Sequence, residues 1–576
     1  MTNISKVLYY KTMNETDRKL YDEITDKYKQ LAQLRKPWEN TWKEIARFVN
    51  PKRNDWDIET EGGKRATEVY SSTAISALDL MCNGLIGYLV SRTTPWLRLK
   101  AENNEYMQYP EVRQYFQDVE EQLYSEFNRS NFYDIQSELF HDAGSTGTAC
   151  VHVDEDYTRE RVNYTARHPK EVYLADDRYG VVDTVLRRYT MTAKQIIEEF
   201  DGKTAPGEGN MLDQAWIDEN KERLYKTFNV IHAVYPRKER DPGKDDNLNK
   251  RYASVYILEG QQRVLRNTGI DEMCDIVWRW DKNTDEVYGR SPAWSALSDI
   301  MRDNRIAKDL MRLGEYTVNP AVQYPGRIEY RLSLMPGGKN PYRDPNELIQ
   351  PIKLGDYPVG NDRELRLTEA IKDAFFVDFF LGLQEISKTM TVPEVMERQS
   401  EKATVLSAAV GRINSELLDP LIDKTFAIAT EAGRMPEPPE VLLANQARVR
   451  IEYIGPLAQV LQRSFATQGI KRSLENVLPY MQVFPDMLDM IDSDELTKQI
   501  LIAGGMPEKI IRKDEDVERI RQARAQQQQA MMQQQALESM AKASSLNQKP
   551  VEGSILSQLG GDNREVVDGS NLDGQI

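Results

Sequence analysis

The feature that most constrains the fold is a block of strand-forming sequence, residues 144–265, set between long segments with helical periodicity. Within the block, short runs rich in β-branched and aromatic residues are bounded by Gly, Pro and Asp, which is typical of antiparallel strands. One sheet-forming stretch with helices before and after it predicts an α+β fold. We expect strands at Ala149–Val153, Val181–Tyr189, Phe228–Tyr235 and Tyr252–Leu258, a loop at Gly202–Asn210, and a charged hairpin tip or linker at Arg237–Arg251.

Amphipathic helices are expected before this block. Apolar residues recur at spacings of three and four through Glu15–Val49, but Pro37 interrupts the pattern and Pro51 ends it. Because proline lacks a backbone N–H and clashes with the preceding turn, this segment is predicted to form two helices. Further helices are expected at Thr67–Tyr88 and Glu111–Phe127.

After the block, two helical segments flank a stretch of different composition. Ser291 and Pro292 have the residue types of an N-cap and a first helical position, and the helix they begin continues to about Tyr316. The composition of Pro320–Asp362 then shifts to Pro, Gly, Tyr and Arg, before a strongly apolar helix at Leu365–Ser387. The two helices are therefore separated by a long excursion rather than by a tight turn.

The C-terminal third is predicted to be mainly helical. Thr391 and Glu394 have the spacing of a capping box in front of a long helix that ends near Gly433. Pro420 lies inside that pattern, so a kink is expected at Asp419. The remaining predicted elements are a strand at Val449–Ile454, helices at Leu457–Met490 and Asp494–Ala503, a helix from Asp514 into the tract Gln526–Gln535, and a polar, disordered tail from about Ala543.

Length and charge limit the class of protein. A chain of 576 residues exceeds what one hydrophobic core supports, so several structural units are expected. The net charge is −16, whereas a protein that grips nucleic acid usually carries a basic patch. Tight, sequence-specific DNA binding is therefore disfavoured, while an acidic surface suits the passage of DNA without adhesion.

The sequence gives no indication of a membrane segment or of export. No apolar run approaches the roughly 18–20 residues that span a bilayer, and the longest candidate, Ala374–Leu383, is interrupted by Asp378. Residues 1–20 lack the apolar core of a signal peptide, so we expect the chain to remain in the cytoplasm where it is made. Three widely separated cysteines form neither a disulfide framework nor a zinc motif: Cys82, Cys150 and Cys274.

The sequence offers only weak candidates for a metal, nucleotide or catalytic site. Alternating residues of one expected strand offer metal ligands, but no second ligand cluster accompanies them, so a half-buried strand running into a turn is the better interpretation. Gly62–Arg65 lacks the first glycine and the Ser/Thr of a phosphate loop, and the histidines have no nucleophile motif beside them. We therefore predict no enzymatic activity, no cofactor and no metal. The alternating residues are Cys150, His152, Asp154 and Asp156.

Five segments, taken together and in order, resemble the head-to-tail connecting, or portal, family of short-tailed bacteriophages. Each is weak by itself, but they span the chain from about residue 15 to 540. Ser71 departs from the family pattern, in which an aspartate is frequent at that place. The segments are Gly63–Ala74 followed by Thr94–Leu99; Tyr288–Pro292; Thr391–Arg398 running to Leu417–Ile422; Tyr453–Ala458; and Gly505–Pro507 with Ile511–Glu515 and the glutamine-rich stretch after them.

The resemblance implies a funnel-shaped homo-oligomeric ring of about twelve copies, in which each chain contributes a wing, a two-helix stem, a clip and a helical crown. On this sequence the wing would comprise residues 1–290, stem helix 1 residues 291–318, the clip 319–362, stem helix 2 363–387, a tunnel loop 388–392, the long wing helix with its return strand 393–456, the crown 457–513, a Gln-rich helix 514–542 and a disordered tail 543–576.

The resemblance also suggests which residues meet DNA and partner proteins. The tunnel loop would project Lys388, Thr389 and Met390 toward DNA. Basic residues of stem helix 1 would touch phosphates transiently, although a solvated helix face with neighbouring aspartates is the simpler interpretation. These residues are Arg302, Arg305, Lys308 and Arg312. The clip would dock the packaging motor and later the tail adaptor through Tyr324, Arg327, Tyr330, Arg331, Tyr342 and Arg343.

The expected partners follow from the same resemblance. They are further copies of the chain, double-stranded DNA without sequence specificity, the terminase large subunit, tail adaptor and tail tube proteins, and the major capsid and scaffolding proteins. Direct membrane contact is not expected. The chain would lie at one capsid vertex of the virion after assembly in the host cytoplasm.

Two alternatives remain from the sequence. A helical internal virion or scaffold-like protein would account for the long helices and the Gln-rich tract, but it has no need for two helices separated by an excursion. A metal-dependent nuclease would require the strand from Cys150 to Asp156 to bind metal.

Overall fold

A computed structural model describes most of residues 15–455 and a few positions beyond them. The chain separates into two compact units, Met1–Phe465 and Ala466–Ile576. In the second unit the described positions are helical, and the account below concerns the first unit. The described residues are 15–56, 60, 62–201, 212, 214–241, 243–244, 246–318, 320, 322–323, 350–351, 358–385, 406–445, 448–455, 497, 517, 519–524, 526–527 and 531.

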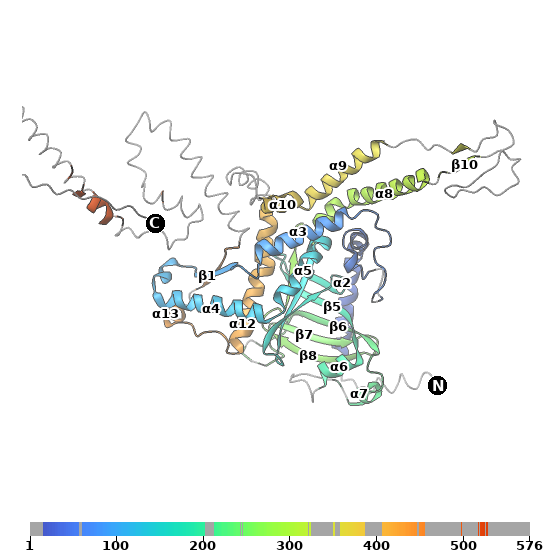
Figure 1. Ribbon diagram of the computed structural model, residues 1–576. Helices are drawn as coiled ribbons and strands as arrows, with labels where there is room; N and C mark the ends of the chain where they lie inside the picture. Colours follow the sequence, from blue (N-terminus) through green and yellow to red (C-terminus); the bar gives the residue numbers. More distant parts are fainter. Residues whose placement is uncertain are drawn as a thin grey trace, which may run out of the picture. The chain divides into compact units, whose positions relative to one another are not determined.

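A five-stranded antiparallel sheet is formed by β4 to β8 in chain order (Figure 1). Successive side chains of each strand point to opposite faces of the sheet, and both faces are covered by helices. One face packs against α2 (Glu15–Phe48), with Ile231 and Ala233 beneath Tyr21 and Ile24. The other face packs Val230 and its neighbours against α6 (Ala193–Phe200) and α7 (Gln214–Asn220). The strands are β4 (Val172–Asp176), β5 (Val182–Thr192), β6 (Thr227–Pro236), β7 (Tyr252–Leu258) and β8 (Arg263–Ile270).

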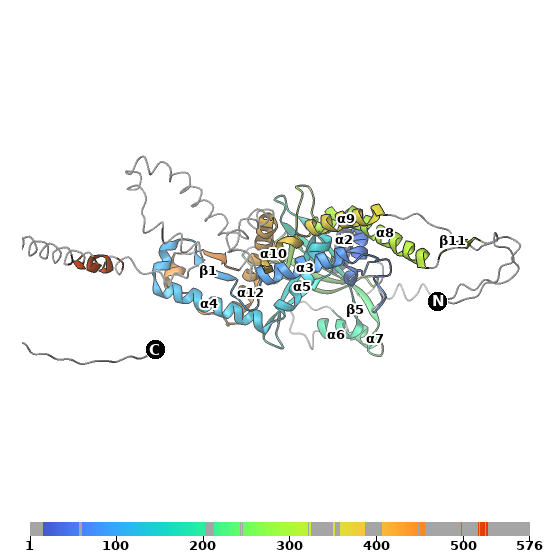
Figure 2. The same cartoon turned by 45° about the horizontal axis from the view of Figure 1, so that its top comes forward.

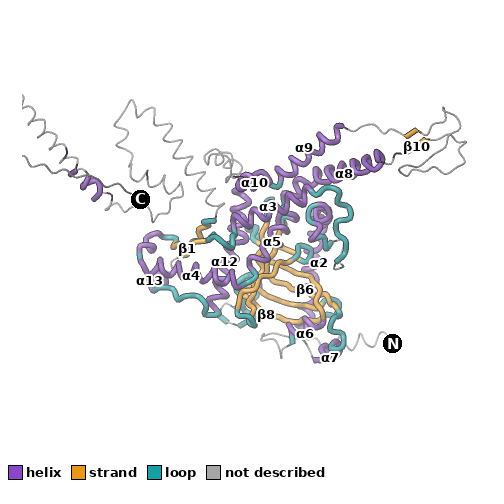
Figure 3. Tube along the Cα trace, in the orientation of Figure 1, coloured by secondary structure: helices purple, strands orange, loops and turns teal. Residues whose placement is uncertain are grey.

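A second, three-stranded antiparallel sheet has the order β3-β2-β9. Figure 3 colours the described strands orange among the purple helices. Helix α5 (Phe132–Thr146) leads directly into β2 through Gly147, whose φ of 89° is left-handed. A Cβ at Gly147 would lie 2.3 Å from the carbonyl oxygen of Gly289, so the turn requires glycine. The strands are β2 (Thr148–Asp156), β3 (Arg161–Arg167) and β9 (Asp275–Arg279).

The largest hydrophobic core lies between this second sheet and a set of helices. A two-stranded antiparallel ladder joins β1 (Leu97–Ala101) to β12 (Val449–Tyr453), which lie more than 340 residues apart in the sequence. Besides α5 and parts of the later helices α8 (Pro292–Val318) and α9 (Pro358–Ala374), the helices that contribute to this core include α3 (Thr73–Leu89), α4 (Pro110–Arg129), α10 (Val377–Glu385), α12 (Asp419–Glu431) and α13 (Glu440–Ala444). Short 3-10 turns lie at Pro51–Arg53 and Asn104–Gln108.

The predicted strands, the helix Glu111–Phe127 and the α+β class are confirmed, but several details were wrong. The strands form two sheets rather than one. Pro37 does not split the first helix, since α2 is continuous; its packing holds it there, with Arg35 donating to the carbonyls of Pro169, Lys170 and Val172. The helix expected from Thr67 begins only at Thr73.

The second helix after the excursion was also predicted incorrectly. Instead of one helix over residues 363–387, α9 (Pro358–Ala374) and α10 are separated at Phe375 and Phe376, where Phe376 has a left-handed φ of 55°. Residues 358–362, expected in the clip, already belong to α9. A kink was expected at Asp419; the structure instead has a π-helical turn at Ile413–Leu418, and Asp419 itself has helical backbone angles where α12 begins.

Candidate functional site: the paired helices α8 and α9

Helix α8 (Pro292–Val318) begins where the sequence predicted, at a serine N-cap. The Ser291 hydroxyl oxygen accepts from the backbone N–H of Trp294 at 3.0 Å, and the hydroxyl donates to the carbonyl of Ser145 at 2.6 Å. The backbone N–H of Gly289 donates to the Thr148 hydroxyl at 2.9 Å. The root of α8 is therefore tied to the junction between α5 and β2.

A cluster of aromatic side chains surrounds that root. Trp294 lies 5.1 Å from Trp38 of α2, and Tyr288 lies 5.2 Å from Trp42, measured between ring centroids. The Tyr288 hydroxyl accepts from the backbone N–H of Leu174 in the five-stranded sheet at 3.0 Å. The start of α8 is thus fixed to both the α2 helix and the large sheet.

Farther along, α8 is held by the segment that precedes α3. The Asn304 side-chain oxygen accepts from the backbone N–H groups of Tyr70 and Ser71 at 2.6 and 3.2 Å, and its amide donates to the Glu68 carbonyl at 3.0 Å. The Lys308 ammonium lies 4.9 Å from the Tyr70 ring centroid. The family segment at residues 63–74 therefore contacts the helix that the segment at residues 288–292 begins.

Helices α8 and α9 run side by side away from the sheets (Figures 1 and 2). The chain that joins them closes on itself, because Val322 pairs with Pro351 and Gln323 with Gln350 in a short antiparallel ladder. Only the first part of α8 has a buried stripe, formed by Ala293, Ala296, Ile300 and Asp303. Beyond Asp303 the described side chains of α8 are half-buried or exposed.

The four basic residues predicted on α8 do not share one environment. Arg302, Arg305 and Arg312 are exposed and lie away from the buried stripe, as their helical spacing requires. Arg302 forms a 3.4 Å ion pair with Asp299, whereas Lys308 is half-buried beside Tyr70. The arrangement leaves three guanidinium groups on a solvent-facing side of the helix pair, where phosphate could reach them.

Apolar side chains are also exposed toward the far end of the pair. Met311, Tyr316 and Val318 of α8 and Leu365 of α9 are each more than half exposed in the isolated chain. A run of exposed large apolar residues on two adjacent helices is typical of a protein–protein contact surface. We call this set the distal surface.

The C-terminal end of α9, opposite the distal surface, is fixed through α10. Phe380 of α10 stacks on Tyr88 of α3 with a centroid separation of 6.3 Å. Gly84 makes room for it, since a Cβ there would lie 2.4 Å from the Phe380 ring. Residues 386–405 follow α10 and lie outside the described residues, so the predicted tunnel-loop residues Lys388, Thr389 and Met390 are not placed.

The predicted clip residues also lie outside the described residues: Tyr324, Arg327, Tyr330, Arg331, Tyr342 and Arg343.

The strand that was considered and disfavoured as a metal site places its polar residues against other partners. The His152 Nδ1 lies 2.9 Å from Asp275, the Asp154 carboxylate accepts from Asn163 at 3.0 Å, and Asp156 pairs with Arg159 at 3.1 Å. Cys150 is buried in an apolar cluster, and burial raises the pKa of its thiol. Within the described residues, no group of three metal-ligating side chains is assembled.

A buried polar network joins the two sheets and contains a serine–histidine pair that the sequence did not predict. His232 Nε2 lies 2.9 Å from the Ser254 hydroxyl, and the Arg167 guanidinium lies 3.5 Å from His232 Nδ1. Because a guanidinium only donates, Nδ1 accepts and the proton is on Nε2, which donates to the serine. The histidine therefore cannot take the Ser254 proton, and burial, together with Arg167, lowers its pKa.

The same network holds an ion pair. Asp275 lies 2.6 Å from Arg167 and 2.9 Å from His152. Burial raises the pKa of Asp275, but the charges of Arg167 and His152 outweigh this effect and hold it below its ordinary value. The arrangement has the features of a structural connection between β2, β3, β9 and the larger sheet.

The comparisons with known proteins identify the family. The model of the family "Bacteriophage head to tail connecting protein" matches residues 21–511. The chain belongs to this family. It is 31% identical over 528 residues to the "Portal protein" of Salmonella phage epsilon15, covering 87% of this chain and 91% of that protein.

A second relative is similar to the same extent. The "Probable portal protein" of Bordetella phage BPP-1 is 29% identical over 535 residues, covering 90% of this chain and 93% of that protein. A solved chain in "Neck of empty GTA particle computed with C6 symmetry" matches 70% of this chain and 86% of its own length, at 9% identity and a TM-score of only 0.34. The predicted family is thus confirmed by the sequence matches, and the described helices include none long and apolar enough to cross a membrane.

Proposed function

We propose that this chain is a portal subunit: about twelve copies form a ring at one capsid vertex that conducts double-stranded DNA during packaging and ejection. The observation that carries the proposal is the match over nearly the whole chain to the connecting-protein family and to a relative named portal protein. The subunit does no covalent chemistry in this role. The ring docks the terminase motor during filling and the tail adaptor afterwards.

The α8–α9 pair supports this role physically. Its distal surface exposes apolar residues that a neighbouring subunit in a ring would cover. Its exposed arginines are few and are accompanied by acidic residues, in a chain of net charge −16. A channel lined by such helices makes weak, repeated contacts with DNA phosphates and does not bind the DNA tightly, which suits DNA that must slide.

The loop Lys388–Met390 would narrow the channel, and the segment around residues 324–343 would contact motor and adaptor. The predicted scaffold-like alternative is less favoured, because α8 and α9 pack together around a closed excursion that a scaffold does not require.

The test is native mass combined with electron microscopy of the purified full-length chain. Closed rings of about 0.8 MDa, expected for roughly twelve chains of 66.4 kDa, with a central hole wide enough for duplex DNA, would support the proposal. Filaments or bundles without a pore would contradict it and favour a scaffold. A packaging assay would then compare wild-type rings with Arg305→Gln/Arg312→Gln rings, which we expect to retain ring mass but package DNA more slowly.

A further inference from the structure

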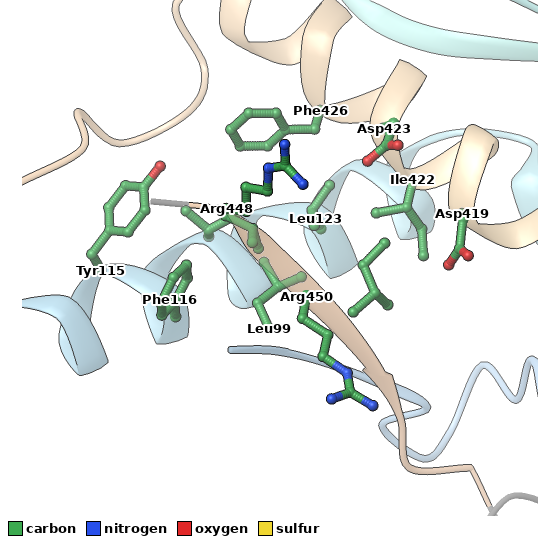
Figure 4. Close-up of a pocket in the computed structure, with 13 residues that line it drawn as sticks. Leu99, Tyr115, Phe116, Leu123, Asp419, Ile422, Asp423, Phe426, Arg448 and Arg450 are labelled. Carbon is green, nitrogen blue, oxygen red and sulfur yellow. The ribbon is translucent and has the colours of Figure 1, made fainter. Parts of the chain in front are cut away.

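A cavity of about 630 Å³ opens between α4, α12 and the strand β12 (Figure 4). Figure 1 shows α4 and α12 away from the α8–α9 pair. Most of its lining is apolar and includes Phe116 and Leu123 of α4 and Ile422 and Phe426 of α12. A pocket of this size and composition can hold several side chains of a peptide segment.

One wall of the cavity carries two carboxylates one helical turn apart, Asp419 and Asp423. The Tyr453 hydroxyl donates to Asp419 at 2.5 Å, and Asp423 forms no ion pair within the described residues. Burial raises the pKa of both groups, and each would be stabilised in its charged form by a cation. In Figure 4 the Arg450 side chain extends away from Asp423, whereas the Arg448 guanidinium extends toward the side of the cavity where Phe426 and Asp423 lie.

The N-terminal segment has a chemistry that complements this cavity. Residues 1–14 contain two lysines, Lys6 and Lys11, and no acidic residue, although the protein as a whole has 91 acidic and 75 basic residues. Between the lysines lies the apolar and aromatic sequence Val7-Leu8-Tyr9-Tyr10. The lysines match Asp419 and Asp423, the apolar residues match the cavity floor, and the tyrosine rings offer a cation–π surface to Arg448 at the cavity edge.

Resting on the ring proposed above, we propose that the N-terminal segment Ile4–Lys11 of one subunit docks in the cavity between α4, α12 and β12 of a neighbouring copy. The segment precedes α2, whose first turns pack on the five-stranded sheet. Figures 1 and 2 both show α2 on one side of this unit and α4 with α12 on the other. Two different surfaces on opposite sides of a subunit give the heterologous contact that closes a ring. Fourteen extended residues reach at most about 50 Å.

The test uses full-length chains with a cysteine in the segment and one at the cavity, Leu8→Cys with Val449→Cys. Val449 lines the cavity and is 53% exposed. Under mild oxidation we expect covalent dimers and longer multimers on a non-reducing gel. The matched control, Leu8→Cys with Tyr225→Cys, places an even more exposed cysteine away from the cavity, and it should cross-link at least about tenfold more slowly.

Charge reversal supplies the specificity control. Lys6→Glu/Lys11→Glu in the cross-linking chain should slow multimer formation by roughly tenfold, and adding Asp423→Lys should restore part of the rate. Rings of native mass that cross-link equally at Val449 and Tyr225 would overturn the docking while leaving the portal proposal intact. A disulfide within one chain, with no multimers, would also overturn it.

A peptide assay separates failure of docking from failure of ring formation. A fluorescent peptide of residues 1–14 should bind the wild-type chain when it is monomeric, and the Lys6→Glu/Lys11→Glu peptide should bind about tenfold more weakly. Monomeric chains that bind the peptide would contradict the ring but support the cavity's preference for this segment. Monomeric chains that bind neither peptide would contradict both.

Discussion

At its root, α8 is capped by Ser291, surrounded by tryptophan side chains and tied to both sheets, whereas its distal half has no buried stripe and exposes Met311, Tyr316 and Val318. The same contrast separates the sheet region from the distal part of the α8–α9 pair. The sheets bury apolar side chains in continuous cores and pair Asp275 with Arg167, while the distal surface leaves its apolar side chains exposed. Substitutions in the first region should therefore change folding, and substitutions in the second should change association.

The largest effect is expected from breaking the buried ion pair between the sheets. Asp275→Ala leaves the buried Arg167 guanidinium without its carboxylate, and removing one partner of a buried pair costs about 3–5 kcal/mol of unfolding free energy. Urea unfolding followed by tryptophan fluorescence measures this change. Asp362→Ala, which removes an exposed ion pair with Arg366, should leave the midpoint unchanged. Equal midpoints for the two variants would show that the network does not stabilise the sheets.

A smaller effect is expected where α10 joins the core. Gly84→Ala would place a Cβ 2.4 Å from the Phe380 ring, and such overpacking costs about 1–3 kcal/mol. Gly87→Ala is the matched control, because it lies on the same helix with nothing within 4 Å of its Cβ and should be neutral or stabilising. Thermal unfolding of the two variants tests the difference, and a stable Gly84→Ala chain would show that α10 is free to move.

These contacts also show how much the sequence could predict. Ser291 and Pro292 identified the start of α8 because a cap is a local pattern. The strands β5, β6 and β7 were predicted because their β-branched and aromatic runs, bounded by turn residues, are also visible within a few neighbouring residues. The division into two sheets was not, since β9 reaches β2 from more than 115 residues away and no local pattern encodes that pairing.

Helix α5 was missed for a related reason. It buries Gln136 and Asp142 along with its apolar residues, so its sequence resembles a mixed polar segment. The role of Asn304 was equally hidden, because one asparagine on a polar helix becomes a contact only when residues 68–71 fold against it.

The segments that suggested the family meet in space. Ile454 donates to the carbonyl of Trp96, Leu97 pairs with Tyr453, and Tyr453 donates to Asp419. The recognisable residues of these segments are therefore those that hold distant parts of the chain together. Of the residues expected to touch DNA, the described ones that are exposed, Arg302, Arg305 and Arg312, form no part of these contacts, which is why the family could be inferred from the sequence while their individual roles stay predictions.

A third effect depends on pH. His232 is buried beside Arg167, Asp275 and His152, and its lowered pKa means that the unfolded chain binds a proton more readily. Stability that is present above the ordinary histidine pKa of about 6.5 should be lost as pH falls below it, by up to roughly 1.4 kcal/mol per pH unit. Thermal unfolding from pH 7.5 to 5 measures the slope. His232→Gln should flatten it, and an unchanged slope would assign the acid sensitivity to other groups.

The smallest effect on stability is expected at the distal surface. Measuring it tests whether substitutions there change association between subunits and leave folding intact. Met311→Ser/Leu365→Ser changes side chains that are more than half exposed, so the free energy of unfolding of the monomer should move by no more than about 0.5 kcal/mol. If neighbouring subunits cover this surface, the same variant should form fewer rings by native mass. Tyr225→Ser is the control, since it removes an exposed apolar side chain elsewhere. A destabilised monomer would mean that the distal helices are part of the core, and rings formed as readily as by the wild type would mean that subunits associate through other surfaces.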